Sequence, residues 1–282
     1  MDELAAKQVL LDFEIIALIT LFVGIGAYAF ALRRSPIIRE TDPDFDGFDL
    51  ALMFFPSILF LINPLFAVLA VESGVEEVER EGESEAIGTL LVNIAYFLFV
   101  GVMTFGIIEW VRNRRVVELF GLNRPTLPLI VLYSILGGVA SLVICSWAIG
   151  GVSQVIMERV FTELAAQESV ETLQEATSVP FLILSIVMAC VAAPLVEEFL
   201  FRGYMYGAVK EATNPVFAAV VIGALFAVVH GNLPALIPLW AFSILLCVAY
   251  DLTRSLWVPI GMHAFFNAAN ILVMLVPQAA ES

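Results

Sequence analysis

The feature that most constrains this chain is a series of apolar runs, each long enough to cross a membrane. A transmembrane helix needs about 20 consecutive apolar residues. Of the 282 residues, 61% are hydrophobic, and the mean hydropathy is +0.96. The sequence therefore predicts an all-α fold, a polytopic membrane helix bundle of about eight transmembrane helices. The predicted spans are residues 10–32, 49–71, 88–109, 128–149, 180–209, 214–231, 233–252 and 256–276.

The distribution of lysine and arginine predicts which side of the membrane each loop faces. Ten of the 13 positive charges lie in or beside the loops that follow spans one, three, five and seven. The positive-inside rule assigns those loops to the cytoplasm. We therefore expect a multi-pass protein of the plasma membrane with both termini outside the cell. The ten residues are Arg33, Arg34, Arg39, Arg112, Arg114, Arg115, Arg124, Arg202, Lys210 and Arg254.

The formal net charge of −15 is concentrated in two acidic stretches, ETDPDFDGFD at 40–49 and ESGVEEVEREGESE at 72–85. Such charge runs are typical of solvated loops, so we expect both stretches to be solvated. An acidic chain repels phosphates, which excludes nucleic acid as a partner. The three cysteines, Cys145, Cys190 and Cys247, lie within apolar spans without metal-binding spacing, and we expect them to be core residues.

Polar and ionisable side chains gather inside the apolar spans of the last hundred residues. An ionisable group at membrane depth costs about 2.5–3.5 kcal/mol on insertion scales. These side chains are therefore expected to face the bundle interior and to contact one another. They are Glu197, Glu198, Arg202, His230, His263, Asn267 and Asn270, and they include both histidines of the chain.

The spacing of these residues places them in pairs on helix faces. Residues four apart lie on one face and can close an ion pair or stack, and a rise of about 1.5 Å per residue puts the pairs at a common depth. Glu197 points about 100° away from its neighbour Glu198. The pairs are Glu198 with Arg202, Phe226 with His230, and His263 with Asn267.

Each of these polar residues and pairs also has a purely structural interpretation. A buried ion pair can simply join parts of a helix, a membrane histidine can bind a backbone carbonyl, and Asn270 can hydrogen-bond a neighbouring helix. Taken together, however, a carboxylate, two histidines and an amide at one depth are typical of a hydrolytic site.

At these residues the sequence resembles the CPBP/ABI family of intramembrane proteases, which includes the Rce1-type CAAX prenyl endopeptidases. The family pattern EExxxR, FxxxH and HxxxN is matched by EEFLFR at 197–202, FAVVH at 226–230 and HAFFN at 263–267. We therefore divide the chain into two parts. Residues 1–127 are N-terminal transmembrane helices (three spans) without a recognised motif, and residues 128–282 are a CPBP-like catalytic helix bundle with its core motifs at 180–275.

The resemblance implies a glutamic endopeptidase that hydrolyses peptide bonds of membrane-embedded or lipidated substrates without a cofactor. Glu197 would act as general base on a water molecule that His230 positions. His263 and Asn267 would donate hydrogen bonds to the oxyanion of the tetrahedral intermediate. The implied supporting residues are Glu198, Arg202 and Phe226, with Glu198 paired to Arg202.

Three alternatives stay open. Glu197, His230 and His263 could bind zinc in a metalloprotease, although Asn267 is a poor zinc ligand and the sequence has no HExxH motif. Buried glutamate and histidine could relay protons or ions in a transporter, although no internal repeat is visible. A non-catalytic immunity or scaffold protein could keep the same fold, although every expected catalytic residue is present.

Overall fold

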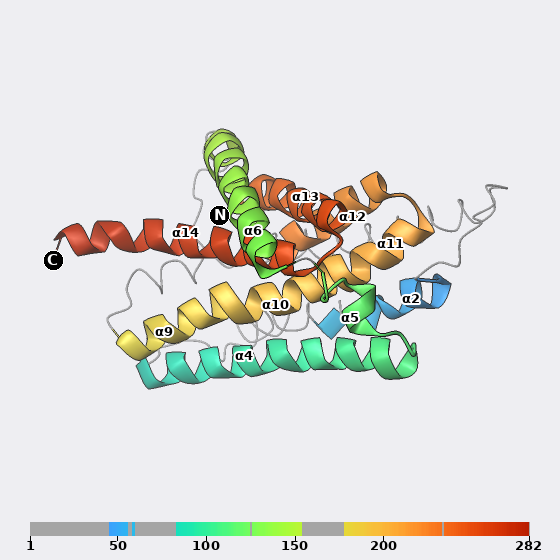
Figure 1. The fold of residues 1–282 in the computed structure, drawn as a ribbon. Helices are drawn as coiled ribbons and strands as arrows, with labels where there is room; N and C mark the ends of the chain where they lie inside the picture. Colours follow the sequence, from blue (N-terminus) through green and yellow to red (C-terminus); the bar gives the residue numbers. More distant parts are fainter. Residues whose placement is uncertain are drawn as a thin grey trace, which may run out of the picture.

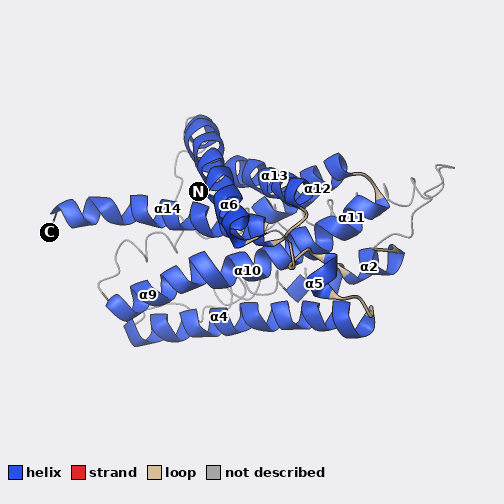
Figure 2. Ribbon diagram, viewed as in Figure 1, coloured by secondary structure: helices blue, strands red, loops and turns tan. Residues whose placement is uncertain are grey.

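The structure is a computed structural model, and the description covers its residues 45–55, 58–59, 83–124, 126–153, 178–232 and 234–281. Within these ranges every regular element is a helix and no strand occurs (Figure 2). Five helices are long and apolar enough to cross a membrane, which confirms the predicted all-α polytopic membrane bundle. They are Ala86–Val111, Leu127–Ser153, Val179–Ala212, Leu236–Thr253 and Trp257–Leu275.

These five helices coincide with five of the eight predicted spans. The span predicted at 214–231 is a shorter apolar helix, α12 (Pro215–Val228). The span predicted at 10–32 and most of the span predicted at 49–71 lie outside the described residues. In the latter region the structure describes the short helix α2 (Gly47–Leu52).

The span that carries the EExxxR motif is one continuous helical path. It begins after Ser178, whose hydroxyl accepts a hydrogen bond from the Phe181 N–H at 3.4 Å, and Pro180 lies in its first turn. Two π-helical segments, η3 and η4, flank the two glutamates, and such segments inside α-helices are frequent at functional sites. The path consists of α9 (Val179–Val187), η3 (Met188–Ala192), α10 (Ala193–Glu198), η4 (Phe199–Met205) and α11 (Tyr206–Ala212).

Helix α12 brings the first histidine motif next to this path. It begins after Asn214, whose side chain accepts a hydrogen bond from the Phe217 N–H at 2.9 Å. It ends at Val228, so His230 lies in the following turn, just before Gly231 at a φ of +59°. Helix α13 (Leu236–Thr253) then returns along α12 and packs against it (Figure 1).

Helix α14 (Trp257–Glu281) carries the second histidine motif and packs against α6 (Leu127–Ser141), which crosses it in Figure 1. The two backbones approach closely: a Cβ at Gly261 would lie 2.2 Å from the Ser134 hydroxyl oxygen. Small residues permit such close approach between membrane helices. This contact fixes the part of α14 that carries His263. On the other side of the bundle, α4 (Glu83–Gly106) runs along α9 and α10.

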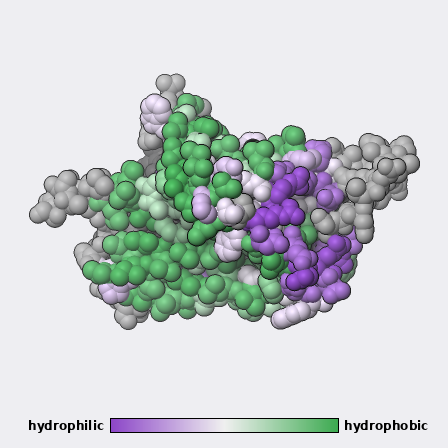
Figure 3. Space-filling view, viewed as in Figure 1, coloured by the Kyte–Doolittle hydropathy of each residue, from purple (hydrophilic) through white to green (hydrophobic). Residues whose placement is uncertain are grey.

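The surface is divided into an apolar part and a hydrophilic end. Apolar residues cover most of the face shown in Figure 3, and hydrophilic residues gather where α2, α11 and α5 (Val116–Leu119) lie. Large apolar side chains are exposed, including Trp110 at 81% and Trp147 at 80%. So much exposed apolar surface is rare on soluble monomers. The chain is an integral membrane protein, while its orientation and its assignment to the plasma membrane stay predictions.

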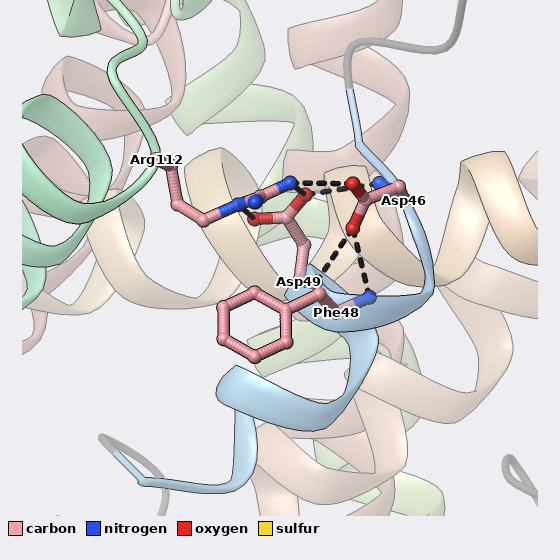
Figure 4. A network of polar contacts seen from close by, with 4 residues as sticks. All are labelled: Asp46, Phe48, Asp49 and Arg112. Carbon is pink, nitrogen blue, oxygen red and sulfur yellow. Dashed lines mark hydrogen bonds and ion pairs between the residues drawn. The ribbon is translucent and has the colours of Figure 1, made fainter.

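Helix α2 is held at the hydrophilic end by a network of ion pairs (Figure 4). Asp46 and Asp49 form a capping box at its start. Arg112 joins both, with its Nε 2.7 Å from Asp49 Oδ1 and an Nη 2.6 Å from Asp46 Oδ2. Burial alone would raise the pKa of Asp46. The hydrogen bonds from Arg112 and from the backbone N–H groups of Asp49 and Phe48 outweigh burial and lower this pKa below its ordinary value.

The expectation that the acidic stretch 40–49 is solvated holds for Asp46, whose side chain is 48% exposed, but is wrong for Asp49. Asp49 is only 2% exposed, and Phe45 packs against Tyr204 and lies where a Cβ at Gly207 would be. The charge of Asp49 is tolerated there because Arg112 neutralises it. The side chains of the second acidic stretch lie outside the described part of the chain.

Candidate active site

The two adjacent glutamates stand at the end of α10, inside the bundle. Glu197 is 5% exposed, and Glu198 and Arg202 are 0% exposed. Arg202 Nη1 donates to Glu198 Oε1 at 2.8 Å, so the ion pair expected from their spacing is present. Removing both charges from water is costly, and their mutual contact offsets part of that cost.

Arg202 has further partners on two other helices. Its Nη2 donates to the hydroxyl of Ser243 on α13 at 2.6 Å. Its guanidinium carbon lies 4.3 Å from the centre of the Phe226 ring on α12, within cation–π range. The sequence analysis missed Ser243, because one serine in an apolar run carries no signal of its partner.

His263 contacts the second glutamate of the motif. Its Nδ1 lies 2.8 Å from Glu198 Oε1, the oxygen that also binds Arg202. A carboxylate paired with arginine only accepts hydrogen bonds, so Nδ1 is the donor. The sequence analysis paired Glu198 with Arg202 alone, and the contact with His263 is an addition that the structure supplies.

Glu197 faces the other histidine. Its Oε2 lies 3.8 Å from His230 Nε2, which is longer than a direct hydrogen bond. His230 Nδ1 lies 2.6 Å from the backbone carbonyl oxygen of Phe226, to which it donates. In the neutral ring Nε2 is then the acceptor nitrogen on the side of Glu197. The side chain of His230 is 25% exposed and that of Glu197 is 7% exposed, so the pair lies at the edge of the buried cluster.

Aromatic rings form the walls of the site. The ring of Phe226 lies 4.5 Å from that of His230 and 5.8 Å from that of His263, measured between centroids. Phe242 contacts His263 edge-on at 5.4 Å and stacks on Phe266 at 4.1 Å. These contacts bury His263, which is 3% exposed, and charge interactions are stronger in such a buried environment. Phe242 is a second residue that the sequence analysis missed.

Asn267 lies one helical turn beyond His263. Its Nδ2 donates to the carbonyl oxygen of Ala189 in η3 at 2.7 Å, which links α14 to the π-helical segment before the glutamates. An amide group has two N–H donors, so one donor is left for another acceptor. Asn270 is half-buried and makes no side-chain hydrogen bond to the described residues.

The described residues do not form the metal-binding group that the zinc alternative requires. Within the described part of the chain, no group of three or more histidine, cysteine, aspartate or glutamate side chains is arranged to hold a metal ion. Glu197, His230 and His263 do not form such a group, and the contact of His263 Nδ1 with Glu198 leaves only its Nε2 free to bind a metal. We derive no catalytic step through a metal.

Comparison with known proteins agrees with the predicted resemblance. Residues 179–269 match the family model described as type II CAAX prenyl endopeptidase Rce1-like. A stretch of 94 residues is 32% identical to the "Putative membrane peptidase YdiL" of Bacillus subtilis (strain 168) and covers 33% of this chain and 38% of that protein. The match thus spans well under half of the relative's length. No solved structure matches. The resemblance is confirmed for the segment that carries all three motifs, and the division at residue 127 stays a prediction.

Proposed function

We propose that this protein is an intramembrane endopeptidase that hydrolyses peptide bonds of membrane-embedded or lipidated substrates. The observation that carries the proposal is the facing pair of Glu197 and His230, 3.8 Å apart, at the edge of a buried polar cluster in a membrane bundle. The match to a prenyl endopeptidase family over the same residues supports it.

Glu197 and His230 are suited to activate water. The 3.8 Å between Glu197 Oε2 and His230 Nε2 suits a water molecule that donates one hydrogen to each. Glu197 Oε2 is buried and has no hydrogen-bond partner among the described residues, so it can accept such a hydrogen. Glu197 takes a proton as the water oxygen bonds to the carbonyl carbon. It returns the proton to the amide nitrogen as the carbon–nitrogen bond breaks.

His263 and Asn267 are suited to stabilise the oxyanion. Because His263 Nδ1 donates to Glu198, its Nε2 can donate only in the imidazolium form. The second N–H of Asn267 is the other donor. Buried donors at this point are each worth about 2.7–4 kcal/mol of transition-state stabilisation.

The decisive variant is Glu197→Gln in purified protein reconstituted in liposomes. We expect cleavage to fall by at least about 10²-fold, because glutamine keeps the size of the side chain but cannot take the proton. The substrates are transmembrane peptides and prenylated peptides, and new termini are detected by mass spectrometry. Glu118→Gln is the matched control, since Glu118 lies on the surface with its side chain 57% exposed.

The outcome separates the proposal from its rivals. Full activity in Glu197→Gln would remove the proposed role of Glu197. Ion flux without cleavage in the wild-type liposomes would favour a transporter, and neither activity would favour a non-catalytic protein. Cleavage of prenylated peptides alone would assign lipidated substrates.

A further inference from the structure

The ion pair between Glu198 and Arg202 has an open geometry. Only one nitrogen of Arg202, Nη1, reaches Glu198, at 2.8 Å from Oε1. Arg202 Nε and Glu198 Oε2 are both buried and have no hydrogen-bond partner among the described residues. Arginine and carboxylate frequently form two parallel hydrogen bonds, and a buried polar atom without a partner is costly. Some other contact must therefore hold the guanidinium away from the two-bond arrangement.

Ser243 is the residue placed to do this. Its hydroxyl, fully buried on α13, accepts from Arg202 Nη2 at 2.6 Å. The ring of Phe226 on α12 lies 4.3 Å from the guanidinium carbon. Hydrogen bonds from a charged donor are about twice as strong as neutral ones. Two helices other than that of the ion pair thus determine where the guanidinium lies.

The open geometry keeps Glu198 directed at His263. Glu198 Oε1 accepts from Arg202 Nη1 and from His263 Nδ1, each at 2.8 Å. If Arg202 lost its bond to Ser243, its remaining donors could close on both oxygens of Glu198. The carboxylate would then turn toward the guanidinium, and its contact with His263 would weaken.

We propose that Ser243 is a positioning residue, which acts through Arg202 and Glu198 to fix the proton on Nδ1 of His263. The consequence for catalysis rests on the proposed function, in which His263 stabilises the oxyanion. The effect of Ser243 on the His263 ring depends only on the contacts of Ser243, Arg202, Glu198 and His263. An experiment can therefore contradict the effect on the ring without contradicting the proposed function, and the reverse.

The test uses the fact that the chain contains two histidines. In protein labelled with ¹⁵N-histidine, the two rings give separate signals, which a His230→Gln sample assigns. The signals and couplings report which ring nitrogen carries the proton. We compare the wild type with Ser243→Ala and with Ser243→Cys, which keeps the size but is a weak acceptor. Ser141→Ala is the matched control, because Ser141 is also fully buried but bonds the Gly137 carbonyl within α6.

We expect His263 Nδ1 to carry a proton in the wild type and in Ser141→Ala, and the ring of His263 to show a mixture of protonation patterns in both Ser243 variants. The turnover number kcat should fall by about 10- to 100-fold with little change in KM, as for a misplaced catalytic group. Wild-type ring signals in both Ser243 variants, or the same change in Ser141→Ala, would overturn the proposal. If the wild type cleaves no peptide, the proposed function fails, and the ring signals still decide the role of Ser243.

Discussion

Arg202 is the buried residue with the most varied contacts in the site. It binds Glu198, donates to Ser243 and lies over Phe226, with no exposed surface. We predict that Arg202→Ala lowers the free energy of unfolding by about 3–5 kcal/mol, because it leaves Glu198 as an uncompensated buried charge. Arg202→Lys should lose less, since lysine keeps the charge but not the planar fork. Thermal unfolding in detergent measures both, and equal melting temperatures would contradict this account of the pair.

Whether catalysis depends on a bound metal ion is also decided by individual side chains. We predict that peptide cleavage survives thorough chelation, because the described residues form no metal-binding group and Asn267 takes the place of a better zinc ligand. Activity is measured before and after treatment with a chelator, together with the metal content of the protein. Stoichiometric zinc, with activity lost on removal and restored on return, would establish the metalloprotease instead.

At this scale the sequence predicts contacts within one helix better than contacts between helices. The pair of Glu198 and Arg202 follows from a spacing of four residues, which any helix turns into proximity. The contact of Glu198 with His263 joins residues 65 apart, and that of Arg202 with Ser243 joins residues 41 apart. Such contacts depend on how the helices pack, and no local spacing encodes them.

At the scale of elements, hydropathy predicted the helices but not their local form. The apolar run at 180–209 corresponds to the helix Val179–Ala212, yet its two π-helical segments were not predicted. Hydropathy averages over a window and does not detect a local change in hydrogen bonding. For the same reason the predicted span 214–231 extends past the end of α12, where His230 lies in a turn.

The contact between α6 and α14 gives a prediction for one glycine. Gly261→Ala would place a Cβ 2.2 Å from the Ser134 oxygen and 2.8 Å from its Cβ, and a Cβ cannot turn away. We expect a loss of about 1–3 kcal/mol in unfolding free energy, typical of overpacking, with lower activity because His263 follows on α14. Gly88→Ala is the control, since nothing lies within 4 Å of its added Cβ. An unchanged melting temperature in Gly261→Ala would mean that the helices separate at little cost.

At the scale of the whole molecule, the apolar surface ends where the charged residues gather (Figure 3). The docked helix α2, the Arg112 network and the loop after α4 lie at this hydrophilic end (Figures 1 and 4). The sequence predicted the membrane class of the chain because hydropathy adds up over many residues. It did not predict that Asp49 is buried. The acidic stretch that contains Asp49 does not indicate that Arg112, distant in the sequence, forms an ion pair with it.

The positive-inside rule predicts that this hydrophilic end faces the cytoplasm. We test this prediction with single cysteines at Glu118, in α5, and at Val179, at the start of α9. The side chain of Glu118 is 57% exposed, and Val179 is 66% exposed. In intact cells an impermeant thiol reagent should label Val179→Cys and spare Glu118→Cys, and permeabilised cells should show labelling of both. Labelling of the unaltered protein gives the background from its own cysteines, of which Cys145 and Cys247 are buried. Labelling of Glu118→Cys but not Val179→Cys in intact cells would reverse the predicted orientation.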